Sequence, residues 1–202
     1  DCPLPIVYYF GDRGAAKTTT MRMDKMLVDP SEIDVKALPK SISDVLSSVA
    51  NQYMVCFDNV SRISEELSNI LCIVATNGYY SKRMLYSDNE ECAIKLDARL
   101  SFSGITNLTA KPDLIDRMVT IKLKRIDSKK RMTEEKIMTS FKKDLPYMLD
   151  GIFRMLSKAV AIYKELNLES LPRMADFARW GYAVAEAMKY GGDKFLEIYE
   201  KN

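Results

Sequence analysis

The sequence contains no histidine, and this absence excludes several kinds of site. Without histidine, the Ser-His and Cys-His pairs that activate many protein nucleophiles cannot form. The four cysteines, Cys2, Cys56, Cys72 and Cys92, are spaced too widely for a zinc site, and no histidine could complete one. Cys56 and Cys72 lie in apolar runs, so we expect them to be reduced core residues of a cytosolic protein.

Long hydrophobic runs and an excess of one charge are also missing. No run approaches the roughly 18 apolar residues of a membrane span, and no signal-peptide pattern opens the chain. Thirty basic and 28 acidic residues give a net charge of +2, so only local basic patches could attract a nucleic acid. The 202 residues, 47% apolar, can form one sizeable domain, or one domain with a small satellite. Because the first residue is not methionine, we expect a fragment of a longer protein.

The most specific pattern begins with residues 5–10, which are apolar or aromatic and typical of a buried strand. Two glycines and several small residues follow, and Lys17 and Thr18 then open a helix. This is the spacing of a phosphate-binding loop (P-loop), except that Ala16 stands where the pattern has glycine. The predicted nucleotide-binding residues are Gly11, Asp12, Arg13, Gly14, Ala15, Ala16, Lys17, Thr18 and Thr19.

Each part of such a loop has a defined role. Backbone N–H groups and the positive end of the helix bind the phosphates. We expect Lys17 to contact the β- and γ-phosphates and the Thr18 hydroxyl to bind Mg²⁺, so the predicted cofactors are ATP and Mg²⁺. The methyl group of Ala16 could crowd the phosphates or open the loop slightly. The alternative is a strand–turn–helix that binds nothing.

A second apolar run ends at Asp58. Downstream of a phosphate loop, this pattern predicts a strand that delivers a carboxylate to Mg²⁺ through water. Asn59 occupies the position where many such ATPases have the glutamate that activates water, and an amide cannot accept that proton. Either another acid serves, with Glu65 and Glu66 as candidates, or hydrolysis is slow. Both acids could equally be first-turn residues of a helix capped by Ser64.

The remaining elements follow from hydrophobic periodicity and turn signals. We expect helices at 18–27, 41–51, 64–76 and 112–117, and strands at 33–38, 53–59, 100–105 and 119–123. Residues 71–75 could also be a strand. Residues 82–86 and 92–96 predict a β-hairpin with an acidic tip. At the end of the strand at 100–105, candidates for contact with water or the γ-phosphate are Ser103, Thr106 and Asn107.

After residue 126 the pattern is helical only. Helices are predicted to begin at Thr133 and at Pro146, and to cover 174–188 and 193–199. The fold class is therefore α/β, with a parallel sheet flanked by helices over residues 1–126 and an all-helical domain over residues 127–202.

The order of these features resembles the AAA+ ATPases, in which a P-loop, an acid-ending strand, a polar strand end and an arginine precede a helical lid. More narrowly, it resembles ATP-binding proteins of phages, plasmids and integrated elements, often linked to primases. The strings that carry the resemblance are Gly14-Ala15-Ala16-Lys17-Thr18, Asp29-Pro30, Asp58-Asn59-Val60-Ser61, Leu71-Cys72, Ala75-Thr76, Leu85-Tyr86, Pro112-Asp113-Leu114, Asp116-Arg117 and Arg173-Met174-Ala175-Asp176-Phe177-Ala178. In that family the alanine before the lysine and the Asp-Asn pair recur, whereas Ser103 replaces an expected asparagine.

The AAA+ resemblance implies a ring, usually a hexamer, with ATP bound between subunits. In that arrangement Arg117 resembles the arginine finger that reaches a neighbour's γ-phosphate, and a surface ion pair is the alternative. Arg173 resembles a second sensor arginine in the lid, with Arg179 as its alternative. On this resemblance the catalytic residues are Lys17, Asp58, Asn59, Ser103 and Arg117.

Primase-linked relatives imply a DNA helicase or translocase motor in mobile-element replication, with a primase domain or protein as a further partner. The residues that this analogy assigns to nucleic acid are Lys36, Lys40, Lys82 and Arg83, with Tyr79 and Tyr80 available for stacking. The basic runs at 129–131 and 142–143 are expected to be solvated helix faces. A non-motor nucleotide switch that loads or regulates protein partners is the competing interpretation, and a small-molecule kinase fits the helical lid poorly.

Overall fold

The computed structural model describes residues 2–83, 91–105 and 107–201, without the side chains at positions 82, 83, 91 and 92. It divides into two compact units, Pro3–Ile126 and Asp127–Asn202, and each is described by itself. Among the helices of the described residues, none combines the length and apolar character needed to cross a membrane.

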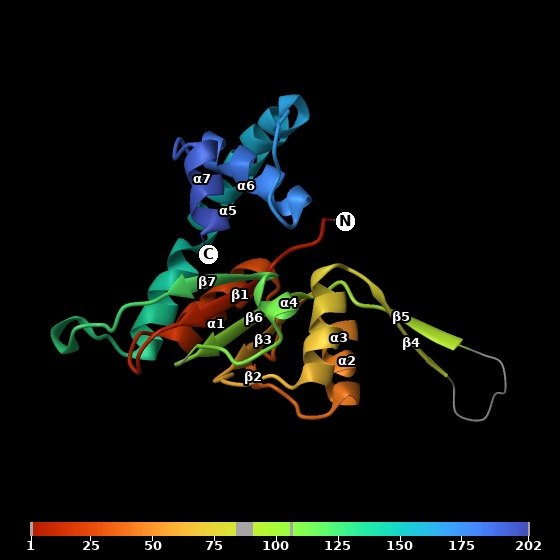
Figure 1. Ribbon diagram of the computed structural model, residues 1–202. Coiled ribbons are helices and arrows are strands. Elements are labelled where there is room, and N and C mark those ends of the chain that lie inside the picture. The colour runs from red at the N-terminus through yellow and green to blue at the C-terminus, as the bar shows by residue number, and fades with distance from the viewer. Residues whose placement is uncertain (1, 84–90, 106, 202) are drawn as a thin grey trace. The chain divides into compact units, whose positions relative to one another are not determined.

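The first unit is built on a five-stranded parallel sheet (Figure 1). Its strands, in spatial order, are β2 (Lys36–Ala37), β3 (Met54–Asp58), β6 (Arg99–Gly104), β1 (Ile6–Phe10) and β7 (Met118–Lys122). All carboxyl ends lie at one edge because every pairing is parallel. The chain leaves β1, in the interior of the sheet, and returns at the far edge as β2, and ligands of open α/β sheets bind beside such crossover points.

Helices cover both faces of this sheet, which explains why β1 and the first four residues of β3 are continuous apolar runs. Helix α1 (Lys17–Val28) packs on one face, and α2 (Ile42–Ala50) and α3 (Glu65–Ala75) cover the other (Figure 1). A single turn, α4 (Pro112–Ile115), adds Leu114 to the core beneath α2 and α3. The predicted parallel sheet flanked by helices is confirmed.

The alternation of side chains along β3 decides where its acid points. Val55 and Phe57 join the core under α2 and α3, whereas Met54 and Cys56 pack with Met21 of α1. Successive side chains of a strand point to opposite faces, so Asp58 continues the α1 face. In β6, which pairs with β3 so that Cys56 lies opposite Ser101, the α1 face carries Ser101 and Ser103.

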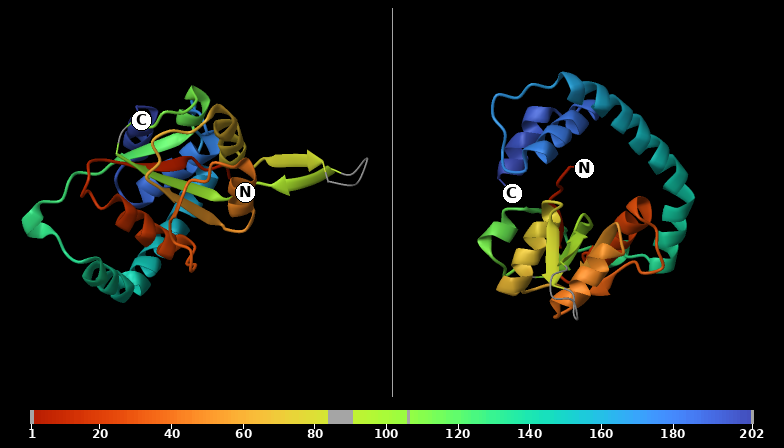
Figure 2. Two further views of the ribbon diagram at one scale, coloured as in Figure 1. Left: turned by 90° about the horizontal axis from the view of Figure 1, so that it is seen from below. Right: turned by 90° about the vertical axis from the view of Figure 1, so that its right-hand side faces the viewer.

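An antiparallel hairpin, β4 (Tyr79–Arg83) and β5 (Glu91–Lys95), projects away from the sheet in the views of Figures 1 and 2. The predicted hairpin is confirmed, although β4 starts before the predicted boundary. Of the acidic tip predicted at 87–91, Glu91 begins β5 and residues 87–90 lie outside the described residues. The strand predicted at 33–38 shortens to the two residues of β2. Residues 71–75 are helical, because they continue the apolar face of α3 into the core.

The second unit contains a short 3₁₀ turn, η1 (Ser128–Lys130), and three helices, α5 (Glu134–Glu165), α6 (Ala175–Ala187) and α7 (Gly192–Glu200). The prediction of a new helix at Pro146 is wrong, because α5 continues through it. Proline removes one helical hydrogen bond, yet its fixed φ is compatible with a helix. Phe141, Leu145 and Leu149 lie at i, i+4 spacing across Pro146 and are the buried or half-buried residues there, so one inward face spans the whole segment.

Aromatic packing joins the helices of the second unit. Tyr163 of α5 stacks on Trp180 of α6, with ring centroids 4.2 Å apart. Phe177 of α6 contacts Phe195 and Tyr199 of α7 edge to face.

Candidate functional site

The loop at residues 11–16 joins β1 to α1 at the carboxyl edge of the sheet. Gly11 fits because a Cβ atom there would lie 2.3 Å from the carbonyl oxygen of Leu123. Gly14 has a positive φ of 81°, which favours glycine. Ala16, the N-cap of α1, also adopts the left-handed conformation, with φ 58° and ψ 28°. The loop therefore has the backbone that a glycine at position 16 would adopt freely, and the alanine bears a steric cost of roughly 1–2 kcal/mol.

Lys17 is the first residue of α1, and its side chain turns back onto the loop. The ammonium donates hydrogen bonds to the carbonyl oxygens of Gly11, at 2.8 Å, and Asp12, at 2.9 Å. The first N–H groups of a helix have no partner within it and form an anion-binding end. A fixed cation and the positive end of α1 thus lie beside the same loop.

Thr18 and Asp58 are distant in sequence and in contact in the structure. The Thr18 hydroxyl lies 3.0 Å from Oδ2 and 3.1 Å from Oδ1 of Asp58. Both side chains are half-buried. A hydroxyl and a carboxylate are oxygen ligands of the kind that Mg²⁺ prefers, so these two residues fit a magnesium ion bound at the loop.

Ser103 and Asn59 complete the polar contacts around this carboxylate. The buried Ser103 hydroxyl donates to Oδ1 of Asp58 and accepts a hydrogen bond from the Asn59 N–H at 3.2 Å. Asn59 has φ 55°, a conformation that asparagine adopts more readily than most residues do. Of the other polar candidates in this strand end, Asn107 is exposed and Thr106 lies outside the described residues.

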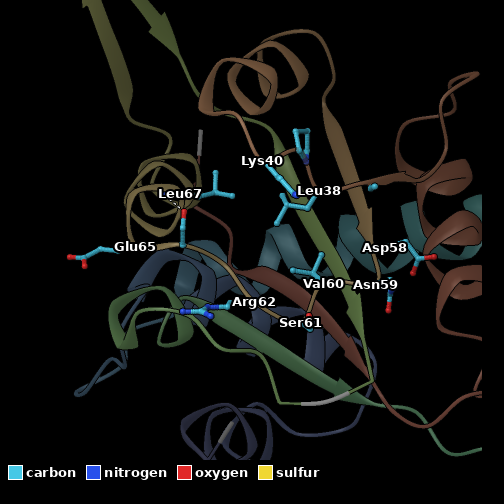
Figure 3. A pocket seen from close by; sticks show the side chains of 12 residues that line it. Leu38, Lys40, Asp58, Asn59, Val60, Ser61, Arg62, Glu65 and Leu67 are labelled. Atoms are coloured by element: carbon cyan, nitrogen blue, oxygen red, sulfur yellow. Dashed lines mark hydrogen bonds between the residues drawn. The ribbon is translucent and has the colours of Figure 1, made fainter.

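A pocket of about 640 Å³ lies next to Asp58, between the loops that follow β2 and β3 (Figure 3). Its lining includes Lys40, one of the predicted nucleic-acid contacts, together with Arg62 and Glu65. In Figure 3 the Asp58 carboxylate points away from Leu38 and Leu67 of this pocket, consistent with its contact with α1.

The two candidate bases, Glu65 and Glu66, begin α3. Ser64 caps this helix by accepting a hydrogen bond from the Leu67 N–H at 3.3 Å. Glu65 forms an ion pair with Lys111 at 2.7 Å, and this hydrogen-bonded partner holds the pKa of the glutamate below its usual value. Glu65 and Glu66 therefore lie in the first turn of a helix capped by Ser64, as the alternative prediction had it.

The three predicted arginines have identified contacts within their own units. Arg117 pairs with the Asp113 carboxylate and donates to the Asp113 carbonyl oxygen at 2.6 Å, as in the ion-pair alternative. In the second unit, the Arg173 carbonyl oxygen accepts a hydrogen bond from the Tyr199 hydroxyl at 3.2 Å. The Arg179 guanidinium lies over the Tyr163 ring, 4.5 Å from its centre.

The remaining residues assigned to nucleic acid are dispersed. The Lys36 ammonium lies 5.8 Å from the centre of the Phe57 ring, and burial lowers the pKa of this lysine. Tyr79 is 64% exposed, whereas Tyr80 packs against the core. The side chains of Lys82 and Arg83 lie outside the described residues. The basic runs at 129–131 and 142–143 are exposed.

The sequence analysis missed a polar cluster at the opposite end of α1. Lys25 is 1% exposed, and its ammonium donates to Asp29 and to the Met54 carbonyl oxygen, both at 2.6 Å. Asp29 also accepts a hydrogen bond from the Met54 N–H at 2.9 Å, and its bond to Lys25 lowers the pKa of its carboxyl group. This cluster ties the end of α1 to the start of β3. The i, i+4 spacing of Lys25 and Asp29 was the available signal.

A second polar pair joins this helix to β1, where the buried Tyr9 hydrogen-bonds to the half-buried Asp24 of α1. Burial raises the pKa of the Asp24 carboxyl group, and burial together with the bond to Asp24 raises the pKa of Tyr9.

Comparison with known proteins gives distant structural likenesses and one family. The apo C-terminal region of NrS-1 aligns with a TM-score of 0.48 and 14% identity, covering 72% of this chain and 36% of that one. A ligand-bound JCV helicase aligns with a TM-score of 0.42 and 13% identity, covering 95% of this chain and 58% of that one. The chain thus spans between a third and three fifths of the length of these structures. Curated proteins give no match. The family described as "Actinomycete integrative conjugative element replication protein" matches residues 1–194, and the chain belongs to this family.

Proposed function

We propose that residues 1–126 form a P-loop ATPase core of AAA+ type, which binds ATP with Mg²⁺, and that residues 127–202 are its helical lid. The observation that carries this proposal is the 3.0 Å contact between the Thr18 hydroxyl and the Asp58 carboxylate. It joins the start of the helix after the Gly11–Ala16 loop to the end of an apolar strand, and this pairing of residue types suits a magnesium–triphosphate complex.

In this proposal each residue of the site has a separate task. The loop amides and the start of α1 bind phosphate oxygens, and Lys17 exchanges its two carbonyl partners for the β- and γ-phosphates. Thr18 and Asp58 hold Mg²⁺, directly and through water. Bound Mg²⁺ supplies charge neutralisation at the phosphates.

Hydrolysis of the bound nucleotide also needs a group that orients or deprotonates water. Asn59 has no basic atom for this task, and Glu65 is tied to Lys111. These two observations favour slow turnover, and they support the non-motor switch as the second candidate function. The motor hypothesis instead requires a general base from another part of the protein, or a water molecule oriented by the Asn59 amide.

The membership in a replication-protein family supports a role in the replication of an integrative element. Together with the AAA+ resemblance, it favours a motor that moves along DNA as a ring, with Arg117 exchanging Asp113 for a neighbour's γ-phosphate. Lys40, together with Lys82 and Arg83 of β4, is a proposed contact with DNA, and a primase is a further proposed partner.

The first test is nucleotide binding by a Lys17→Ala variant. Loss of charge-assisted hydrogen bonds, each contributing about 1.5–3 kcal/mol, is expected to weaken binding of a fluorescent ATP analogue roughly 10- to 100-fold. Lys201→Ala removes an exposed lysine that pairs with Glu197 and is the matched control. Unchanged affinity in Lys17→Ala would refute the assignment of the loop.

A second measurement separates the two candidate functions. ATP hydrolysis and the mass in solution are measured with and without single-stranded DNA. The motor proposal expects DNA to raise the rate and ATP to promote assembly. Hydrolysis that is indifferent to DNA would select the switch.

A further inference from the structure

Ser103 lies where a sensor of the γ-phosphate was expected, yet its hydroxyl is already committed. A serine hydroxyl has one hydrogen to donate, and in Ser103 this hydrogen goes to Oδ1 of Asp58. The hydroxyl oxygen of Ser103 itself accepts a hydrogen bond from the Asn59 N–H at 3.2 Å. The residue is 1% exposed, so it lies beneath the carboxylate and away from solvent.

The sheet register explains how Ser103 reaches this place. Cys56 of β3 pairs with Ser101 of β6, and one alternation further along both strands brings Asp58 beside Ser103 on the same face. Tyr9 of β1 pairs with Ser103 from the other side. The backbone of Ser103 is therefore held between two neighbouring strands, which places its side chain beside Asp58.

The backbone at Ser103 fixes the loops on both sides. Its carbonyl oxygen accepts the Val60 N–H at 2.7 Å, which holds the turn after β3. The next carbonyl, of Gly104, accepts the Gly11 N–H at 3.3 Å, which holds the start of the phosphate loop. A Cβ atom at Gly104 would lie 2.0 Å from the Tyr8 hydroxyl oxygen, so only glycine allows the strand to pass this close to Tyr8.

We propose that Ser103 is a positioning residue that fixes the Asp58 carboxylate and the left-handed turn at Asn59 for metal binding, and that it does not contact the triphosphate. This inference rests on the proposed function of the site. Thr18 donates to the carboxylate from the helix and Ser103 from the sheet, so the carboxylate is oriented before the metal arrives. Partners that orient a metal ligand from behind typically contribute roughly 10- to 100-fold to metal affinity.

The test separates the metal-dependent part of nucleotide binding from stability. Affinity for a fluorescent ATP analogue is measured in EDTA and across a Mg²⁺ titration, beside the thermal unfolding midpoint. In Ser103→Ala we expect unchanged affinity in EDTA and a Mg²⁺ midpoint roughly 10-fold higher. Ser103→Thr keeps the hydroxyl and is expected to recover most of the Mg²⁺ response.

Ser101→Ala is the matched control. Ser101 is 0% exposed, lies on the same face of β6, and donates to the Cys56 sulfur at 3.3 Å rather than to Asp58. It is expected to lower the unfolding midpoint without moving the Mg²⁺ midpoint. Equal Mg²⁺ midpoints in Ser103→Ala and the wild type would overturn the proposed role of Ser103, and so would equal shifts in both serine variants. Neither result would overturn the proposed function of the site. A wild-type chain whose nucleotide binding ignores Mg²⁺ would overturn the proposed function as well.

Discussion

Helix α1 and strand β3 are joined by polar groups at both ends. The two junctions differ in how deeply their side chains are buried and in how completely their hydrogen-bonding groups are paired. At the carboxyl end of the sheet, Thr18 contacts Asp58, and both side chains are half-buried. At the other end, Lys25 is fully buried, and it shares Asp29 and the backbone of Met54 in a closed set of hydrogen bonds. The junction at the start of α1 is therefore suited to exchange its hydrogen-bond partners, whereas the junction at the end of α1 is suited to hold the helix on β3.

This difference separates function from stability along a single helix. Removing one member of a buried ion pair leaves its partner without a hydrogen-bonded counter-charge, which strongly lowers the free energy of unfolding. Exposed polar groups instead replace a lost partner with water. The two lysines of α1 near these junctions, Lys17 and Lys25, should therefore respond to mutation in opposite ways. Lys17 is expected to matter for ligand binding, and Lys25 for folding.

The largest expected effect comes from Lys25→Ala. Removing the ammonium leaves the Met54 carbonyl oxygen without its donor, while Asp29, whose side chain is 25% exposed, keeps its hydrogen bond from the Met54 N–H. The lost hydrogen bonds and the lost packing of the buried lysine chain are expected to cost about 3 kcal/mol. Lys17→Ala, whose ammonium bonds only loop carbonyls, is expected to change stability by less than about 0.5 kcal/mol. Urea unfolding of both variants measures the contrast.

Equal losses of stability in the two lysine variants would contradict the comparison. Lys25→Met is a useful second variant because it keeps most of the buried chain and removes the charge together with the N–H donors. If it restores most of the lost stability, packing of the side chain dominates rather than the hydrogen bonds to Asp29 and Met54.

A smaller, pH-dependent effect is expected at Asp29. Its folded pKa is lowered, mainly by the hydrogen bond from Lys25, below the value of about 3.9 expected when unfolded. The ionised carboxylate therefore contributes stability that is present above about pH 4 and is lost as pH falls through the folded pKa. The stability difference between the wild type and Asp29→Asn should be constant from pH 7 to 5 and shrink below pH 4.

Asp24, on the same helix, supplies the control of opposite sign. Burial raises its folded pKa, so its contribution is fully present below the unfolded pKa and is lost as pH rises through the folded value. Relative to Asp24→Asn, the wild type should therefore gain stability as pH falls towards 4. If the stability differences between the wild type and the two asparagine variants changed with pH in the same direction, the opposite pKa shifts of Asp29 and Asp24 would be contradicted.

Much of the first unit could be predicted because its signals are local. The apolar run before Asp58 and the small-residue loop before Lys17 each mark a strand end or a helix start, and the structure brings both to one edge. The place of Ser103 also follows from alternation, since Ser101 and Ser103 share a face with Cys56 once the register is known.

Other features depend on contacts that no local pattern specifies. The burial of Lys25 is set by how α1 lies on β3, and an i, i+4 pair with Asp29 would read equally well as a solvated helix face. Pro146 gives a helix-start signal, but the apolar spacing on both sides of it overrides that signal in α5. In both cases the tertiary contact, rather than local propensity, decides the outcome.

The smallest expected effect contrasts two adjacent alanines of the loop. Ala16 is left-handed, so Ala16→Gly removes a steric cost of roughly 1–2 kcal/mol and adds unfolded-chain entropy of about 0.4–1 kcal/mol, for a net stabilisation of about 0.5–1 kcal/mol. Ala15 is buried and has no positive φ, so Ala15→Gly should destabilise by about 1 kcal/mol through added entropy and a lost methyl contact. Thermal unfolding midpoints of the two variants should move in opposite directions. A fall in both would mean that the methyl group of Ala16 is accommodated without strain, and that the loop prefers alanine there.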